Sequence, residues 1–203
     1  MGVADRAVGL SAGQLAAARV IEREFVAAKY PPGVIAAAIV NAYAESGLNP
    51  AASGDKARSI GLFQLHEKGA GAGMTAAQRA DPVTNTRRIL GVVQGSYGRR
   101  LRELALLSGG HPAAVAKLAA VFSTDIERPA NTALAEMHRA ALAWRLFPLG
   151  VEAVPTRAPV PAGSTRSAPF SLWWVTGGVT LVIALAVLIA RARARPSSPG
   201  VTP

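Results

Sequence analysis

The chain has 203 residues, half of which are hydrophobic, and a formal net charge of +10. This length accommodates one globular domain with appendages. The chain contains no cysteine, which excludes a disulfide scaffold, thiol catalysis and a cysteine-ligated metal. Its positive charge favours polyanionic partners, and nucleic acid, anionic lipid and anionic cell-wall polymer all remain open.

Alanine-rich segments between prolines and capping residues predict a helical N-terminal domain. Ser11 and Gln14 form a capping-box pattern for a helix that runs to about Lys29. Further helices are expected to begin near Pro32, Pro82, Tyr97, Pro112 and Asn131, and Thr75 is expected to cap a short turn. The expected fold class is all-α with minimal β structure, because only a small hairpin around residues 53–64 interrupts the helices.

The C-terminal part of the chain predicts a membrane anchor. Residues 148–170 contain five prolines and form an expected linker. Residues 171–190 carry no charge and are long enough to cross a bilayer as one helix of about 20 residues. Trp173 and Trp174 stand at one end, and arginines follow at the other. The expected architecture is a domain over 1–147, a linker, a transmembrane helix over 171–190 and a tail over 191–203 that is basic and then Ser/Pro-rich.

The membrane orientation leaves two locations open. Positive charges after residue 190 favour a cytoplasmic C-terminal end, with the domain outside. The first residues do not have the pattern of a secretory signal peptide, which leaves export of the domain unexplained. The chain is therefore expected either in a viral (virion) membrane, as part of a phage particle, or in a bacterial cell envelope as a C-terminally anchored protein.

Glu45 is the candidate catalytic acid. Ile35, Ala38, Ala42 and Glu45 share one face of the expected helix, which sets a carboxyl group at the end of an apolar stripe. Burial and the partial negative charge of the helix C-terminus both raise the pKa of a carboxyl group, and a protonated carboxyl can donate to a leaving-group oxygen. The alternative interpretation is an exposed glutamate at a fraying helix end.

The residues around Glu45 carry a family resemblance. Glu45-Ser46, Asn49-Pro50 and Gly61-Leu62-Phe63-Gln64 resemble the motifs of the lysozyme-like superfamily, particularly soluble lytic transglycosylases, goose-type lysozymes and phage virion domains. Asp81-Pro82 with Asn85 is similar to a helix start of that family, and residues 126–129 are similar to a segment of phage tail lysozyme domains. The resemblance covers roughly residues 12–147. It implies a lysozyme-like fold and cleavage of the β-1,4 bond between MurNAc and GlcNAc in peptidoglycan.

The resemblance also suggests roles for individual residues. Glu45 would act as general acid and then base. The expected substrate-binding residues are Ser46, Ser59, Phe63, Gln64 and Tyr97; for Phe63 and Tyr97 core packing remains an alternative, as does a backbone hydrogen bond for Gln64. A hydrolase requires a second carboxylate, for which Asp55 is the first candidate. A lytic transglycosylase requires one glutamate, because the substrate's C6 hydroxyl attacks and leaves a 1,6-anhydro product. We favour the transglycosylase outcome.

Other functions remain as alternatives. One is a non-catalytic, lysozyme-like structural membrane protein, and another is a basic membrane protein that organises nucleic acid, although no specific nucleic-acid binding is expected. The three histidines are far apart in sequence, so neither a metal site nor a cofactor is expected. The expected partners are peptidoglycan glycan strands and the lipid bilayer; protein partners stay undefined.

Overall fold

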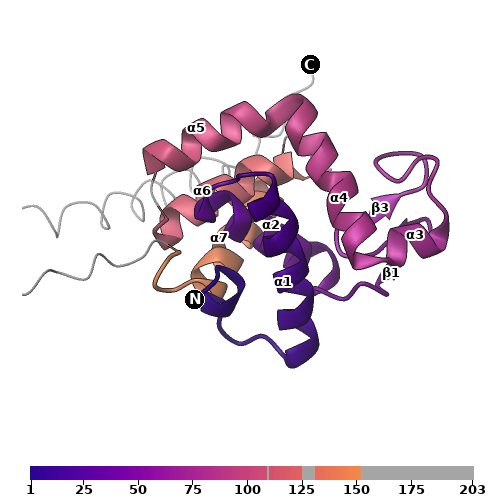
Figure 1. The fold of residues 1–203 in the computed structure, drawn as a ribbon, viewed down its shortest axis with the longest axis horizontal. Helices are drawn as coiled ribbons and strands as arrows, with labels where there is room; N and C mark the ends of the chain where they lie inside the picture. Colours follow the sequence, from indigo (N-terminus) through magenta and orange to yellow (C-terminus); the bar gives the residue numbers. More distant parts are fainter. Residues whose placement is uncertain (109, 125–130, 152–203) are drawn as a thin grey trace, which may run out of the picture. The chain divides into compact units, whose positions relative to one another are not determined.

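The computed structural model describes residues 1–108, 110–124 and 131–151, and these residues are mostly helical, as expected. Figure 1 shows the small set of strands at one side of the helices, beside α3 and α4. The helices and strands, in chain order, are η1 Ala4–Arg6, α1 Ala12–Ala27, α2 Pro32–Ser46, β1 Ser53–Gly54, β2 Ser59–Ile60, β3 Leu65–His66, α3 Ala76–Ala80, α4 Pro82–Val92, the π-helical η2 Val93–Tyr97, α5 Gly98–Ser108, α6 Pro112–Phe122 and α7 Thr132–Leu146.

Local capping explains where several of these helices begin. Ser11 and Gln14 form the predicted capping box at the start of α1, and Thr75 forms a second one at α3. Asn131 accepts a hydrogen bond from the Leu134 amide at the start of α7. Proline occupies the first position of α2, α4 and α6. The N–H at this position has no partner within a helix, so a residue that lacks it costs no helical hydrogen bond.

Helix α2 forms the centre of the domain. Its residues from Gly33 to Ala42 are all buried, and it packs against α1, α6 and α7 (Figure 1). A helix that is apolar on every side is stable only when neighbours cover it all round. The expected single apolar stripe was therefore too narrow: between the exposed Pro32 at its start and the last turn, which carries Glu45, the helix is buried on every side.

The strands form a short antiparallel sheet in the order β1-β2-β3. Ser53 pairs with Ile60, and Ser59 pairs with His66. The expected hairpin around residues 53–64 is present, and a third strand extends it. This sheet carries the Gly61–Gln64 turn, which connects β2 to β3.

The packed part of the domain continues past Phe147 into the segment expected as linker. Val151 is 2% exposed, its amide donates to the Gly110 carbonyl over 2.7 Å, and its carbonyl accepts from Arg6 over 2.8 Å. The rest of the expected linker, the expected transmembrane helix over 171–190 and the tail over 191–203 lie outside the described residues. Within the described ranges, no helix combines the length and apolar character needed to cross a membrane.

Candidate functional site

Glu45 lies in the last turn of α2, where the chain leaves the core. Gly47 ends the helix in the left-handed conformation, with φ of +64°, and its carbonyl accepts a hydrogen bond from the Gln14 side chain over 2.9 Å. The Glu45 side chain is 28% exposed. The helix end thus holds one carboxylate at the boundary between the core and solvent.

A cavity of about 270 Å³ contains this carboxylate. The cavity brings the end of α2 together with the β2–β3 turn, the following loop and α4. Glu45 is the one carboxylate among the residues that line it, and His66 is the other titratable group. The lining residues are Glu45, Phe63, Gln64, Leu65, His66, Gly69, Ala70 and Ile89.

An arginine from α7 holds the Glu45 carboxylate. Arg139 donates from Nη2 to Glu45 Oε1, and its side chain is only 7% exposed. Its Nε donates to Asn41 Oδ1 over 3.0 Å, and the Asn41 amide nitrogen donates to the carbonyls of Ala37 and Ala119 over 2.8 and 3.2 Å. The apolar stripe expected around this carboxyl group is therefore only part of its surroundings, because a guanidinium group from α7 is hydrogen-bonded to it.

The β2–β3 turn opposite Glu45 is built around Gly61 and Asn85. Gly61 has φ of +91°, and a Cβ atom there would lie 2.1 Å from the Arg79 carbonyl oxygen and 2.3 Å from Asn85 Nδ2. Asn85 is fully buried; it accepts from the Phe63 amide over 3.1 Å and donates to the carbonyls of Ile60 and Arg79 over 3.1 and 2.7 Å. One asparagine side chain therefore fixes the turn that presents Phe63 and Gln64.

The helix that carries Asn85 begins beside this turn. Asp81 caps α4 by accepting from the Thr84 amide over 2.7 Å. The hydrogen bonds from Thr84 hold the pKa of Asp81 below its ordinary value. The Asp-Pro-x-x-Asn segment accordingly has two structural functions: Asp81 starts the helix, and Asn85 ties the helix to the turn.

Ser46 hydrogen-bonds the backbone. Its hydroxyl lies 2.9 Å from the carbonyl oxygens of both Ala42 and Leu62. Since Leu62 belongs to the Gly61–Gln64 turn, Ser46 joins the end of α2 to this turn. It is a positioning residue beside the cavity and is not among the lining residues.

Three further expected site residues lie outside the cavity lining. Asp55 is exposed in the β1–β2 turn with φ of +47°, and its carboxylate accepts from the Ser59 hydroxyl over 3.3 Å. Ser59 is 8% exposed and is committed to that contact. Tyr97 is half-buried at the end of η2, where it packs against the core. Sequence proximity to Glu45 suggested Asp55, but the sheet directs it elsewhere.

Phe63 and Gln64 do line the cavity with Glu45. Phe63 is 4% exposed and its ring is stacked 6.1 Å from that of Phe122, so it also packs in the core. The Gln64 amide nitrogen donates to the carbonyls of Ala52 and Gly61 over 3.1 and 3.0 Å. No hydrogen bond to Gln64 Oε1 comes from the described residues, so this oxygen can accept one from a ligand.

Sequence reasoning missed Arg139 and Asn41. Arg139 occupies the buried face of α7 together with Ala135, Leu142 and Leu146, and a lone arginine at apolar spacing was a readable signal. Asn41 is similarly the one polar residue in a long apolar run of α2. A buried polar side chain needs a partner. These two residues therefore indicated a buried polar contact, although not which residues make it.

Other titratable groups do not gather into a metal site within the described residues. His66 Nδ1 accepts from the Lys68 amide over 3.1 Å, and the His111 side chain caps α6. Residues 126–129, whose sequence is similar to a segment of phage tail lysozyme domains, lie outside the described residues.

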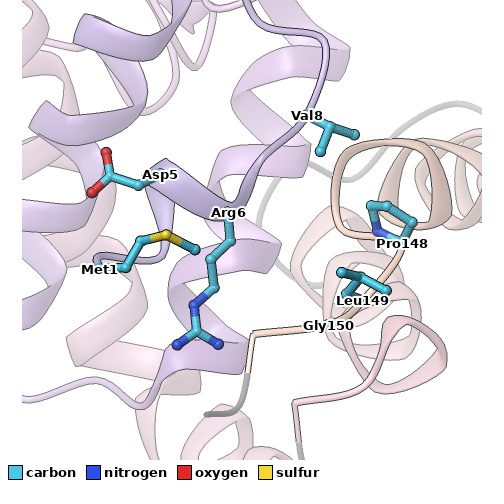
Figure 2. A pocket seen from close by; sticks show the side chains of 7 residues that line it. All are labelled: Met1, Asp5, Arg6, Val8, Pro148, Leu149 and Gly150. Carbon is cyan, nitrogen blue, oxygen red and sulfur yellow. The ribbon is translucent and has the colours of Figure 1, made fainter. Parts of the chain in front are cut away.

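A larger cavity, of about 400 Å³, lies away from Glu45 at the C-terminal end of α7 (Figure 2). It is lined by Met1, Asp5, Arg6, Val8, Pro148, Leu149 and Gly150. Its charged groups already have partners, because Asp5 pairs with Arg19 over 2.8 Å and Arg6 donates to the Val151 carbonyl. The smaller cavity is the better candidate for chemistry, since it holds a carboxylate, an imidazole and an amide.

No protein-family model, no curated protein and no solved structure matches the chain.

Proposed function

We propose that this protein is a peptidoglycan-cleaving muramidase with a lysozyme-like domain, and that Glu45 transfers the proton at the glycosidic bond. The observation that carries the proposal is the shared cavity of Glu45, Phe63 and Gln64. These residues come from two segments that the sequence motifs had singled out separately. A carboxyl group beside an amide acceptor and an aromatic edge suits a sugar that carries an N-acetyl group.

The cavity favours a lytic transglycosylase over a hydrolase. Among the described residues, Glu45 is the one carboxylate that lines it, and Asp55 lies in the exposed β1–β2 turn. A two-carboxylate mechanism needs both groups across the same bond. With a single carboxylate, Glu45 would first protonate the leaving oxygen and then accept the proton of the substrate's own C6 hydroxyl. The cavity, at about 270 Å³, would hold the sugar at the reacting bond, with the remaining glycan outside it.

Arg139 would position the carboxylate in this mechanism. Its guanidinium is fixed by Asn41, so Glu45 Oε1 has a set location while Oε2 remains for the substrate. The ion pair stabilises the carboxylate that exists after proton donation.

The same ion pair is the observation that favours a second candidate function. A glutamate bound to a buried arginine also stabilises the contact between α2 and α7 without any chemistry. The second candidate is accordingly a non-catalytic, lysozyme-like structural protein of a virion or cell envelope. In both cases we propose that residues 171–190 anchor the chain in the membrane.

Peptidoglycan digestion by the full chain tests the proposal. Wild type is expected to clear peptidoglycan in a zymogram and to release 1,6-anhydro ends detectable by mass spectrometry. Glu45→Gln, which keeps a hydrogen-bonding side chain of the same size, should abolish clearing, whereas the matched change Asp55→Asn should leave it intact. Equal clearing by wild type and Glu45→Gln refutes the role of Glu45. If wild type instead releases reducing ends, and Asp55→Asn no longer releases them, the protein is a hydrolase. If wild type releases no product, the structural protein is favoured.

A further inference from the structure

The outer face of α7 carries an apolar stripe that no described residue covers. The inner face of this helix, from Ala135 through Arg139 to Leu146, packs into the domain. At 100° per residue, the stripe lies opposite that face and repeats at intervals of three and four residues. It consists of Leu134, Met137, Ala141 and Trp144, all of which are exposed.

The stripe is made of large side chains rather than scattered small ones. Leu134 is 63% exposed, Met137 is 70% exposed and Trp144 is 54% exposed. A helix in a globular domain normally turns polar residues to water on its outer side. An apolar stripe at regular helical spacing on that side therefore indicates a surface that is covered in the working state of the protein.

The area of the stripe is too small for a stable dimer. Three large side chains expose on the order of a few hundred Å². A standard protein–protein interface buries roughly 800 Å² on each partner. The stripe also spans little more than one heptad, whereas a coiled-coil pair needs several. A second copy is consequently a poor occupant for this face.

The charges and side-chain types around the stripe fit a lipid surface. Trp144 combines an apolar ring system with an N–H group, which suits the boundary between headgroups and acyl chains. Arg145 is exposed beside the stripe, Glu136 is exposed on the same helix away from it, and the chain as a whole carries a net charge of +10. The Arg145 guanidinium lies 4.6 Å from the centre of the Tyr43 ring. A basic residue and a tryptophan at an apolar stripe fit the pattern of helices that lie flat on anionic membranes.

Further exposed apolar side chains lie at the C-terminal end of α7. Figure 2 shows Val8 beside Pro148 and Leu149 at the larger cavity, where Leu149 is 90% exposed and Val8 is 48% exposed. The Val8 amide donates to the Leu146 carbonyl over 2.9 Å, which ties the N-terminal segment to the last turn of α7. Exposed apolar side chains therefore continue beyond Trp144 at this end of the helix.

We propose that the outer face of α7 docks on an anionic lipid bilayer, with Leu134, Met137 and Trp144 inserted at the headgroup boundary. This proposal does not depend on Glu45 or on any catalytic activity. It is compatible with an anchor at 171–190, because the 19 intervening residues, 152–170, could span at most about 70 Å if fully extended. A short tether raises the local concentration of the domain at the membrane and favours weak docking.

Spin labelling of the full chain tests the proposal, and the absence of cysteine makes each label unique. Met137→Cys is labelled, and the protein is reconstituted into vesicles of phosphatidylcholine and phosphatidylglycerol. Val26→Cys on α1 is the matched control, since Val26 is an apolar residue that is 53% exposed. We expect the label at 137 to lie roughly 5–10 Å inside the headgroup boundary by oxygen and nickel accessibility, and the label at 26 to remain in water.

Two results would overturn it. Equal exposure of both labels to the aqueous nickel reagent would mean that α7 does not touch the bilayer. Dipolar broadening between labels at 137 on different molecules, without immersion in lipid, would make the stripe an interface between copies of the chain. Because both positions are exposed, the labels should leave the helical fold unchanged. Circular dichroism of both labelled proteins checks this.

Discussion

Substitution of Gly61 by alanine should destabilise the domain strongly. Gly61 has φ of +91°, a conformation that costs alanine about 1 kcal/mol relative to glycine. The added Cβ would also lie 2.1 Å from the Arg79 carbonyl oxygen and 2.3 Å from Asn85 Nδ2. Both neighbours are held firmly, since the first is backbone and the second belongs to a fully buried side chain.

The size of the effect follows from these contacts. Forcing a methyl group into a packed site costs about 1–3 kcal/mol. Displacing the Asn85 amide also weakens its bonds to the Ile60 and Arg79 carbonyls, at about 1 kcal/mol each. Because relaxation relieves part of the clash, we expect a loss of about 3–5 kcal/mol in the free energy of unfolding. For a domain of this size that corresponds to a decrease in Tm of roughly 6–20 °C.

Thermal and urea unfolding, followed by circular dichroism, measure this loss. Gly91→Ala in α4 is the matched control, because the residue is inside a helix and a Cβ atom there would meet no other part of the domain within 4 Å. This control should gain about 0.5–1 kcal/mol. If Gly61→Ala unfolds at the same temperature as wild type, the close packing of the β2–β3 turn against Arg79 and Asn85 is incorrect, and with it the positioning of Phe63 and Gln64.

Three further predictions concern the polar contacts. The hydrogen bond from Arg87 lowers the pKa of Glu24 in the folded state below its ordinary value of 4.5. The ion pairs of Glu24 therefore stabilise the fold above about pH 4.5, and this stabilisation is lost as the pH falls through the lower pKa of the folded state. In urea unfolding, Glu24→Gln should be less stable than wild type at neutral pH, and the difference should vanish in acid. Asn85→Ala removes three hydrogen bonds and should cost about 2–4 kcal/mol by the same assay, whereas an effect below about 1 kcal/mol would contradict its role in the turn. A double-mutant cycle with Glu45→Gln and Arg139→Gln should yield a coupling energy of about 1–2 kcal/mol, and additive effects would mean that the pair does not form in solution.

The two motifs that proved to meet were identifiable from sequence, but their supports were not. Glu45 and the Gly61–Gln64 segment are short, recognisable patterns, and the structure brings them to one cavity. Ser46 and Asp55 were expected to take part in the same chemistry. The Ser46 hydroxyl instead joins two backbone segments, and the Asp55 side chain is exposed in a turn. The direction of a side chain after a tight turn depends on backbone dihedrals that residue type alone does not determine.

The sequence by itself determined where the helices of the domain begin. Ser11, Thr75 and Asn131 were correctly assigned as caps because a cap bonds to a backbone amide only three residues away. The tertiary structure alone decided what surrounds Glu45. Arg139 is 94 residues distant in the chain, and the two meet only because α7 packs against α2. Helix packing depends on the fit of whole surfaces, which local sequence signals do not encode.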